Sequence, residues 1–215
     1  MTEDPRPRLE VLRLGRTPWQ AAYELQQARL AARLRGDVPD ALFLCEHDPV
    51  ITLGRRSPSD DAAGAPFPII AIERGGEATY HGPGQLVAYP VLELPEGRRD
   101  LHRYLRDLEQ VGIETLAAFG VAGQRREGYT GVWIGDLKVA SIGVAVRRWV
   151  TWHGLALNVT TDLDAFRTFQ PCGLDASVMT RLADHAAAVS VAEVAPRFEA
   201  AFRAQFGFAP RDSRL

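Results

Sequence analysis

The order of apolar and polar positions predicts short strands and three helices. A strand is expected over 8–14 and a helix over 18–35. Thr17 and Pro18 should cap the start of this helix, because proline suits a first helical turn, and Gly36 should end it, because glycine suits a left-handed exit. Apolar runs bounded by turn residues predict further strands at about 41–46, 50–53, 69–73 and 86–93.

The second half continues this pattern. A helix is expected over 101–119, starting at Asp100, because its apolar residues recur at helical spacing before Gly120. Residues 131–159 alternate and are rich in β-branched residues, so they predict two or three strands with a hairpin turn at Gly135-Asp136. The last helix is expected to begin at Ser190 with a capping box to Glu193, and to end at Gly207.

These elements indicate one α/β (α+β) domain over residues 1–215, with a mixed sheet flanked by helices. A chain of 215 residues with 46% apolar residues is long enough to bury one substantial core. Residues 57–68, rich in Pro, Asp, Ala and Gly, are expected to form a surface loop.

Charge and composition narrow the classes of partner. A net charge of -2 provides no basic field for nucleic acid or an anionic membrane surface, so neither partner is expected. The sequence shows no apolar leader at its start and no run of eighteen apolar residues, which predicts a cytoplasmic protein. Two cysteines are too few for a disulfide framework, and both are expected to be free thiols.

The two cysteines lie in opposite surroundings. Cys45 ends the apolar run 41–45 and is expected to be a buried structural thiol. Cys172 stands between Pro171 and Gly173, a pattern typical of a tight loop that can present a sulfur to substrate. A free thiol in an ordinary turn would have the same local sequence, so both interpretations stay open.

Lys138 is the only lysine among 25 basic residues. Arginine keeps its proton at working pH, whereas a lysine can be shifted into the acid/base range by burial or neighbours. A single retained lysine therefore indicates a proton-transfer role, although codon bias explains most of the arginine excess.

Residues 74–90 contain the densest glycine segment, with Arg-Gly-Gly-Glu-Ala-Thr-Tyr-His-Gly-Pro-Gly-Gln at its start. The segment is neither a phosphate-binding P-loop nor a dinucleotide fingerprint, because the following residues and the glycine spacing are wrong. Close backbone approach to a substrate and an elaborate turn between two strands are both compatible with it.

Histidine and carboxylate residues offer two further sites to consider. The run Cys45-Glu46-His47-Asp48 is not expected to bind a metal, because adjacent strand residues point to opposite faces, and no metal or cofactor is predicted. His81 and His153 are candidates for a Cys-His pair of the peptidase or thioesterase type, or else packed core histidines.

Taken together, these segments resemble the lipoyl (octanoyl) transferase family. The resemblance runs through residues 45–175, where Glu46-His47, the stretch 74–90, Gly135 to Gly143, His153-Gly154, Asn158 and Pro171-Cys172-Gly173 carry it. It implies the fold of the biotin and lipoate protein ligases. It also implies transfer of an octanoyl group from octanoyl-acyl carrier protein to a lysine of lipoyl domains, in 2-oxoacid dehydrogenases and the glycine cleavage H protein.

The resemblance implies a site as well as an activity. Cys172 and Lys138 match the positions of the family's catalytic dyad, with an acyl-Cys172 thioester as intermediate and no ATP. The acyl site would be lined by Arg74, Gly75, Gly76, Glu77, Ala78, Thr79, Tyr80, His81, Ser141, Ile142, Gly143, Gly154, Leu155 and Ala156.

Three other functions are compatible with parts of this sequence. An ATP-dependent lipoate or biotin protein ligase would share the fold and need no cysteine. A thioesterase or peptidase using Cys172 with His153 or His81 would hydrolyse the acyl group. A non-catalytic domain that binds acyl carrier or lipoyl domains would keep its whole function after Cys172→Ser.

Overall fold

The protein, seen here in a computed structural model, is described over residues 6–58 and 61–210. Its strands are β1 (Leu9–Arg16), β2 (Asp40–Glu46), β3 (Val50–Leu53), β4 (Ile69–Ala71), β5 (Thr79–His81), β6 (Gln85–Val91), β7 (Gln124–Arg126), β8 (Tyr129–Ile134), β9 (Leu137–Arg147) and β10 (Val150–Asn158). Its α-helices are α1 (Trp19–Arg35), α2 (Leu101–Ala117) and α3 (Val191–Phe206). Short 3-10 turns are η1 (Glu96–Arg98), η2 (Leu163–Thr168), η3 (Pro171–Gly173), η4 (Ala176–Val178) and η5 (Leu182–Asp184).

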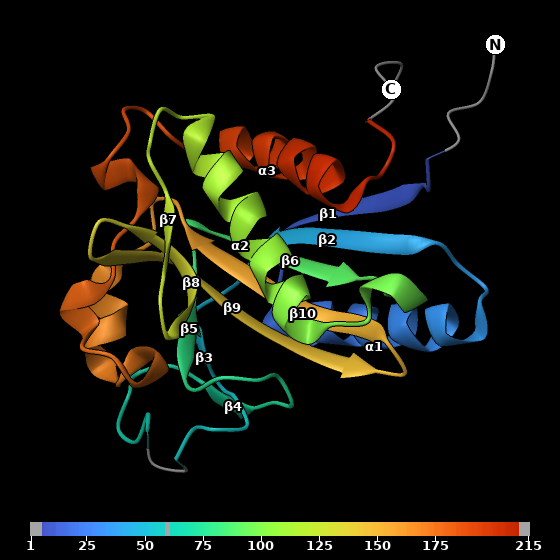
Figure 1. Ribbon diagram of the computed structural model, residues 1–215. Helices are drawn as coiled ribbons and strands as arrows, with labels where there is room; N and C mark the ends of the chain where they lie inside the picture. The colour runs from blue at the N-terminus through green and yellow to red at the C-terminus, as the bar shows by residue number, and fades with distance from the viewer. Residues whose placement is uncertain (1–5, 59–60, 211–215) are drawn as a thin grey trace.

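A seven-stranded sheet in the order β1-β2-β6-β10-β9-β8-β7 forms the centre of the fold (Figure 1). β1 and β2 run parallel and are joined by α1, while the other neighbours are antiparallel. Helices α2 and α3 cover one face of this sheet and α1 the other. A smaller sheet, β4-β3-β5, lies beside the strands β8 and β9 (Figure 1). The mixed α/β class predicted from the sequence is confirmed.

The helix ends follow the sequence, with two corrections. Gly36 and Gly207 end α1 and α3 in the left-handed conformation, and the Asp100 side chain accepts from two backbone N–H groups of α2, as predicted. Pro18 is the N-cap of α1, and its side chain has no acceptor for a helix N–H. The Thr17 hydroxyl donates to the Leu14 carbonyl, so no side chain caps this helix.

The capping box of α3 forms only in part. The Glu193 N–H donates to the Ser190 hydroxyl oxygen at 3.3 Å, as predicted. The Glu193 carboxylate accepts from that same hydroxyl at 2.7 Å, rather than from the backbone N–H that a complete box uses.

The strands 131–159 form the predicted meander, with three members and a turn at Gly135 (φ +56°). Two short strands, β5 and β7, were not predicted, because their three residues form no apolar run of the kind that marks the equally short β4. The predicted loop 57–68 has no helix or strand where it is described. It nevertheless buries Ala62 and packs Phe67 against Tyr80, with ring centroids 5.1 Å apart.

Within residues 6–58 and 61–210, no helix is both long enough and apolar enough to span a bilayer. The assignment of residues 1–215 to one domain stays a prediction.

Gly112 tests how closely α2 must approach the sheet. A Cβ there would lie 2.6 Å from the Val132 Cγ2 atom, and valine cannot rotate away cheaply. We expect Gly112→Ala to lower the free energy of unfolding by about 1–3 kcal/mol, since overpacking outweighs the better helix propensity of alanine. Urea unfolding measures the change. Gly97→Ala, where an added Cβ meets nothing within 4 Å, is the matched control and should be nearly neutral; equal stability of the two variants would contradict the packing argument.

Candidate active site

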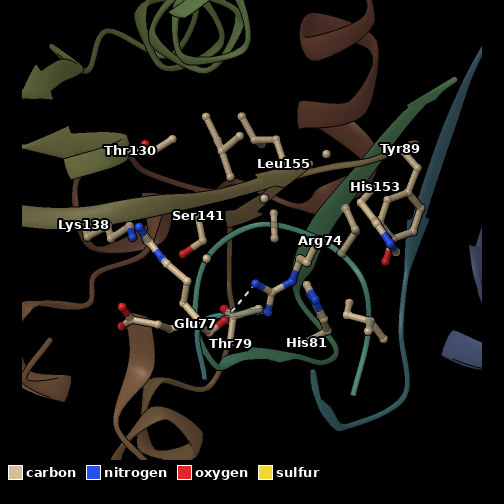
Figure 2. Close-up of a pocket in the computed structure, with 18 of the residues that line it drawn as sticks. Arg74, Glu77, Thr79, His81, Tyr89, Thr130, Lys138, Ser141, His153 and Leu155 are labelled. Carbon is tan, nitrogen blue, oxygen red and sulfur yellow. Dashed lines mark hydrogen bonds between the residues drawn. The ribbon is translucent and has the colours of Figure 1, made fainter. Parts of the chain in front are cut away.

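A cavity of about 170 Å³ opens where the small sheet meets β9, β10 and the segment 72–77. Figure 2 shows Lys138, Ser141 and Thr130 toward one end, His153 and Tyr89 toward the other, and Arg74 between them. Of the residues predicted for the site, the cavity is lined by Lys138, Arg74, Gly76, Glu77, Thr79, His81, Ser141, Ile142, Gly143, Gly154, Leu155 and Ala156.

The alternation of β5 explains which of the predicted residues 74–81 reach the cavity. Thr79 and His81 face it, whereas Ala78 and Tyr80 point to the opposite side and join a separate apolar cluster. The Tyr80 ring packs there against Phe166, at 5.6 Å between centroids. Gly75 also lies outside the lining, with its N–H donating to the Val144 carbonyl at 2.9 Å. The run therefore contributes Arg74, Gly76, Glu77, Thr79 and His81 rather than a continuous wall.

The Arg74 guanidinium is buried and ties the glycine-rich segment to β3. Its Nη2 donates to the Thr52 carbonyl at 2.8 Å and to the Thr52 hydroxyl at 3.0 Å. Its Nη1 donates to the Glu77 carbonyl at 2.8 Å. Because the rigid Arg74 guanidinium makes several well-aimed hydrogen bonds, the loop 74–77 is held in a single shape over the cavity.

The His81 ring is neutral and fully engaged. Gln85 uses its amide N–H groups on the Tyr80 carbonyl and on Asn158, so its oxygen accepts from His81 Nδ1 at 2.8 Å. His81 Nε2 is left to accept from the Thr52 hydroxyl at 3.4 Å. Burial, with the nearby His47 as a second cause, lowers the pKa of His81 to about 3. His81 is therefore a poor proton acceptor at neutral pH.

His153 is held in a strained conformation at the other end of the cavity. Its φ is +57°, which is uncommon for a residue other than glycine, and its backbone N–H donates to Gln26 at 3.0 Å. Burial lowers its pKa, although the nearby Glu73 works in the opposite direction. The His153 Nε2 lies 3.8 Å from Glu73 Oε1, within ion-pair range but too far for a hydrogen bond.

Gly143 and Gly154 were expected to line the acyl site, and the structure shows that they also make room for other parts of the protein. A Cβ on Gly143 would lie 2.8 Å from the Arg74 Cδ atom, and one on Gly154 would lie 2.2 Å from the Ala88 carbonyl oxygen. The two residues face each other across β9 and β10. Their lack of side chains therefore lets Arg74 and strand β6 approach the floor of the cavity.

Lys138 is 3% exposed, one residue after the start of β9. Its Nζ lies 5.9 Å from the centre of the Trp133 ring. Its carbonyl accepts from the Thr180 N–H at 3.0 Å, and its backbone forms a bridge with Met179. The segment that follows Cys172 in the chain is thus fastened beside Lys138.

Cys172 lies in the turn η3, and its side chain is outside the part of the chain that the structure describes. The next residue, Gly173, has φ +66°, as the tight loop predicts. A Cβ there would lie 2.3 Å from Glu77 Oε2, so the cavity residue Glu77 packs directly on this glycine. The backbone of the Cys172 loop is therefore anchored at the cavity on one side and at Lys138 on the other.

Cys45 is the buried structural thiol that the sequence predicted. It is 3% exposed and belongs to the core between α1 and the sheet. Burial raises the pKa of the Cys45 thiol to about 12, so it stays protonated. Among the described residues, no cluster of three or more His, Cys, Asp or Glu side chains is arranged to hold a metal ion.

Comparison with known proteins now adds the family. Residues 18–203 match the model of the lipoyl protein ligase A/B catalytic domain. An octanoyltransferase of Gloeobacter violaceus is 50% identical over 196 residues, which cover 90% of this chain and 88% of that protein. This chain belongs to the octanoyltransferase family. The resemblance noted in the sequence, and with it the acyltransferase class, is confirmed.

Solved structures show the same fold with much lower identity. A bipartite lipoate protein ligase of Thermoplasma acidophilum superposes with a TM-score of 0.77 at 19% identity, covering 96% of this chain and 87% of that one. A biotin protein ligase of Aquifex aeolicus has a TM-score of 0.54 at 12% identity, covering 93% and 68%. The predicted biotin/lipoate ligase-like fold is confirmed for this octanoyltransferase family member.

Several cavity residues were not predicted from the sequence. Trp19 comes from the first turn of α1, and Thr130 from β8. Neither stands in a motif, and each reaches the cavity only through packing between elements distant in the chain. Tyr89 lay inside the glycine-rich stretch but carried no signal of its own beyond its place on an expected strand.

Glu73 lies beside the cavity residue His153 and has a shifted pKa, so the pH dependence of stability tests the role of its charge. The nearby His153 ring lowers the pKa of Glu73 from 4.5 to about 2, together with hydrogen bonds that the Trp152 indole N–H and the Tyr23 O–H donate at 2.9 Å each. A depressed carboxyl pKa stabilises the fold above the unfolded-state pKa, and that stability is lost as pH falls toward the folded-state value. We expect Glu73→Gln to be less stable than wild type at pH 7, with the difference shrinking between pH 4.5 and 2. Urea midpoints across this range measure it, with the exposed Glu24→Gln as control, and a pH-independent difference would contradict the role of the charge.

Proposed function

We propose that this octanoyltransferase family member moves an octanoyl group from octanoyl-acyl carrier protein to a lysine of lipoyl domains through an octanoyl-Cys172 thioester. Acyl transfer is the chemistry of the family. The observation that carries the mechanism is the placement of the only lysine, buried at the cavity, with the segment after Cys172 paired to its backbone.

Cys172 would be the nucleophile and Lys138 its acid/base partner. Thiolate is the reactive form of cysteine, and an ammonium group nearby favours it. The sulfur attacks the thioester carbonyl of the donor, and the carrier leaves as a thiol after taking the proton of the Lys138 ammonium, which becomes a neutral amine. The acceptor lysine then attacks the acyl-Cys172 carbonyl and passes a proton to Lys138 as the sulfur departs.

The cavity supports an acyl chain of moderate length. At roughly 0.8 kcal/mol for each buried CH₂ group, six methylenes contribute nearly 5 kcal/mol before ordering costs. From Lys138 to Gly143 the strand β9 advances about 17 Å at 3.4 Å per residue, while seven carbon–carbon bonds of about 1.5 Å reach at most about 11 Å. A chain attached near Lys138 would therefore end near Ser141, about 10 Å along β9 and one residue short of Ile142 and its partner Leu155.

The remaining assignments belong to the same proposal. Arg74, Gly76, Glu77, Thr79, His81, Ser141 and Ala156 would shape the acyl site, together with the residues just named. The acceptors would be the lipoyl domains of 2-oxoacid dehydrogenases and the glycine cleavage H protein, and the reaction would take place in the cytoplasm. No ATP is required, because one thioester exchanges for another and the final amide is more stable.

The Cys-His hydrolase interpretation has less support. Both ring nitrogens of His81 are used within the protein, and burial holds the pKa of His81 near 3. The pKa of His153 is also lowered by burial, and its Nε2 faces Glu73. An ATP-dependent ligase on the same fold would require ATP for transfer, so omitting ATP from the assay separates that function from acyl exchange.

Covalent catalysis predicts an adduct. Incubation with octanoyl-acyl carrier protein, without acceptor or ATP, should add one octanoyl group to the wild-type chain, and peptide mapping should locate it on Cys172. Cys172→Ser should remain unmodified, whereas Cys45→Ser should acquire the adduct as wild type does, because Cys45 is buried in the core. An unmodified Cys172 peptide, or release of free octanoate in place of the adduct, would contradict the proposal.

Exchange of the lysine tests proton transfer. Lys138→Arg retains the positive charge but cannot accept a proton at working pH, so we expect octanoyl transfer to fall by about 100-fold or more while thermal stability changes little. Arg147→Lys, at the exposed far end of β9, is the control and should leave the rate unchanged. Normal transfer by Lys138→Arg would exclude a proton shuttle at this position.

A further inference from the structure

A buried carboxylate outside the cavity bears on the position of Lys138. Glu109 lies on α2 with no exposed surface. Its Oε2 accepts from Arg106 Nη1 at 2.7 Å and from Arg125 Nε at 3.1 Å, and its Oε1 accepts from the Gly131 backbone N–H at 3.1 Å. One side chain thereby joins α2, β7 and β8.

Gly131 is the member of this group that touches Lys138. A Cβ on Gly131 would lie 2.8 Å from Lys138 Cε and 2.5 Å from the Ala140 carbonyl oxygen. The φ of Gly131 is +141°, a conformation that other residues rarely adopt. The lysine stem therefore lies across the backbone of Gly131, in space that any side chain would fill.

The strand pairing is irregular on both sides of Gly131. The register of β7 against β8 shifts between Gln124 and Arg126, and that of β8 against β9 shifts between Val132 and Trp133. At such bulges the ladder leaves backbone groups to be paired by other means. The Glu109 carboxylate supplies an acceptor at this irregular point, behind the strand that supports the lysine.

We propose that Glu109 is a positioning residue that fixes Gly131, and through it the Lys138 side chain. The inference rests on the proposed function only where it concerns catalysis. The geometric part, that Glu109 determines where the Lys138 stem lies, stands independently of any acyl transfer.

The hydrogen bond to Gly131, rather than the negative charge, is the essential contact. The Arg106 and Arg125 side chains are 52% and 37% exposed, so water can solvate them if Glu109 is removed. The Gly131 N–H is buried against α2 and has no such replacement. Glu109→Gln keeps an acceptor oxygen for that N–H and should preserve the lysine's position, whereas Glu109→Ala should not.

A matched control exists on α3. Glu199 is a buried carboxylate that likewise accepts from two arginines, Arg13 and Arg203, but it does not border the cavity. Glu199→Ala should lower stability by a comparable route. Any effect that Glu109→Ala has beyond that of Glu199→Ala is therefore attributable to its contact with Gly131.

The lone lysine permits a direct readout of position. In protein labelled with ¹³C-lysine, the side-chain Cε–Hε signal belongs to Lys138 alone, and its shift depends on the Trp133 ring close by. We expect this signal to move or broaden in Glu109→Ala, and to stay at the wild-type position in Glu109→Gln and Glu199→Ala. Octanoyl transfer should follow the same order, with kcat lower by about tenfold in Glu109→Ala and KM nearly unchanged, because a small displacement of a catalytic group is costly.

The two measurements separate failure of this inference from failure of the proposed function. An unshifted lysine signal in folded Glu109→Ala would overturn the positioning role, whatever the activity. A shifted lysine signal in Glu199→Ala as well would also overturn it, since the effect would then be general. A shift confined to Glu109→Ala, in a chain whose wild type transfers no octanoyl group, would support the positioning role and refute the proposed function.

Discussion

Burial of one amine beside a cavity of mixed polar and apolar lining is the constraint on which the site depends. A lysine that is 3% exposed has lost nearly all its contact with water, which is costly for an ammonium group unless its surroundings are fixed. Three contacts fix the surroundings of the lysine. Gly131 leaves space for its stem, the Trp133 ring lies near its Nζ, and Thr180 binds its carbonyl.

The opposite wall of the cavity is fixed by a chain of hydrogen bonds rather than by apolar packing. Arg74 donates to Thr52, Thr52 to His81, His81 to Gln85, and Gln85 to Asn158, whose amide donates to the Thr180 carbonyl at 3.0 Å. The last link ends at the residue whose N–H binds Lys138. Both walls are therefore coupled through Thr180, and the histidine in this chain acts as a neutral relay of hydrogen bonds.

The sequence predicted those features that depend on local physics. Gly36 and Gly207 end helices because only glycine adopts the left-handed exit cheaply, and Asp100 caps α2 because its carboxylate is next to free N–H groups. The choice of Lys138 as a site residue also needed no structure, since it follows from a single exception in composition.

Features that depend on contacts between distant elements were beyond the sequence. Nothing in the local pattern of α2 distinguishes Glu109 from an exposed acidic residue of a helix, and Gly131 shows no turn signal. The strand β5 is too short for its alternation to be seen, so the run 74–81 was expected to line the site as a whole, although Ala78 and Tyr80 face an apolar cluster. These residues acquire their roles only when the small sheet packs beside β9.

Fold and chemistry separate clearly in this protein. Ligases of 12–19% identity share the arrangement of strands and helices with this octanoyltransferase family member, so the sheet itself does not determine which reaction is catalysed. What the fold supplies is a cavity floor made of Gly143 and Gly154, over which lies a loop held by Arg74. The two groups proposed to react, Cys172 and Lys138, stand on the turn η3 and near the start of β9, and the segment after that turn is paired to the lysine backbone at Met179. The sheet supports these elements without specifying which side chains they carry.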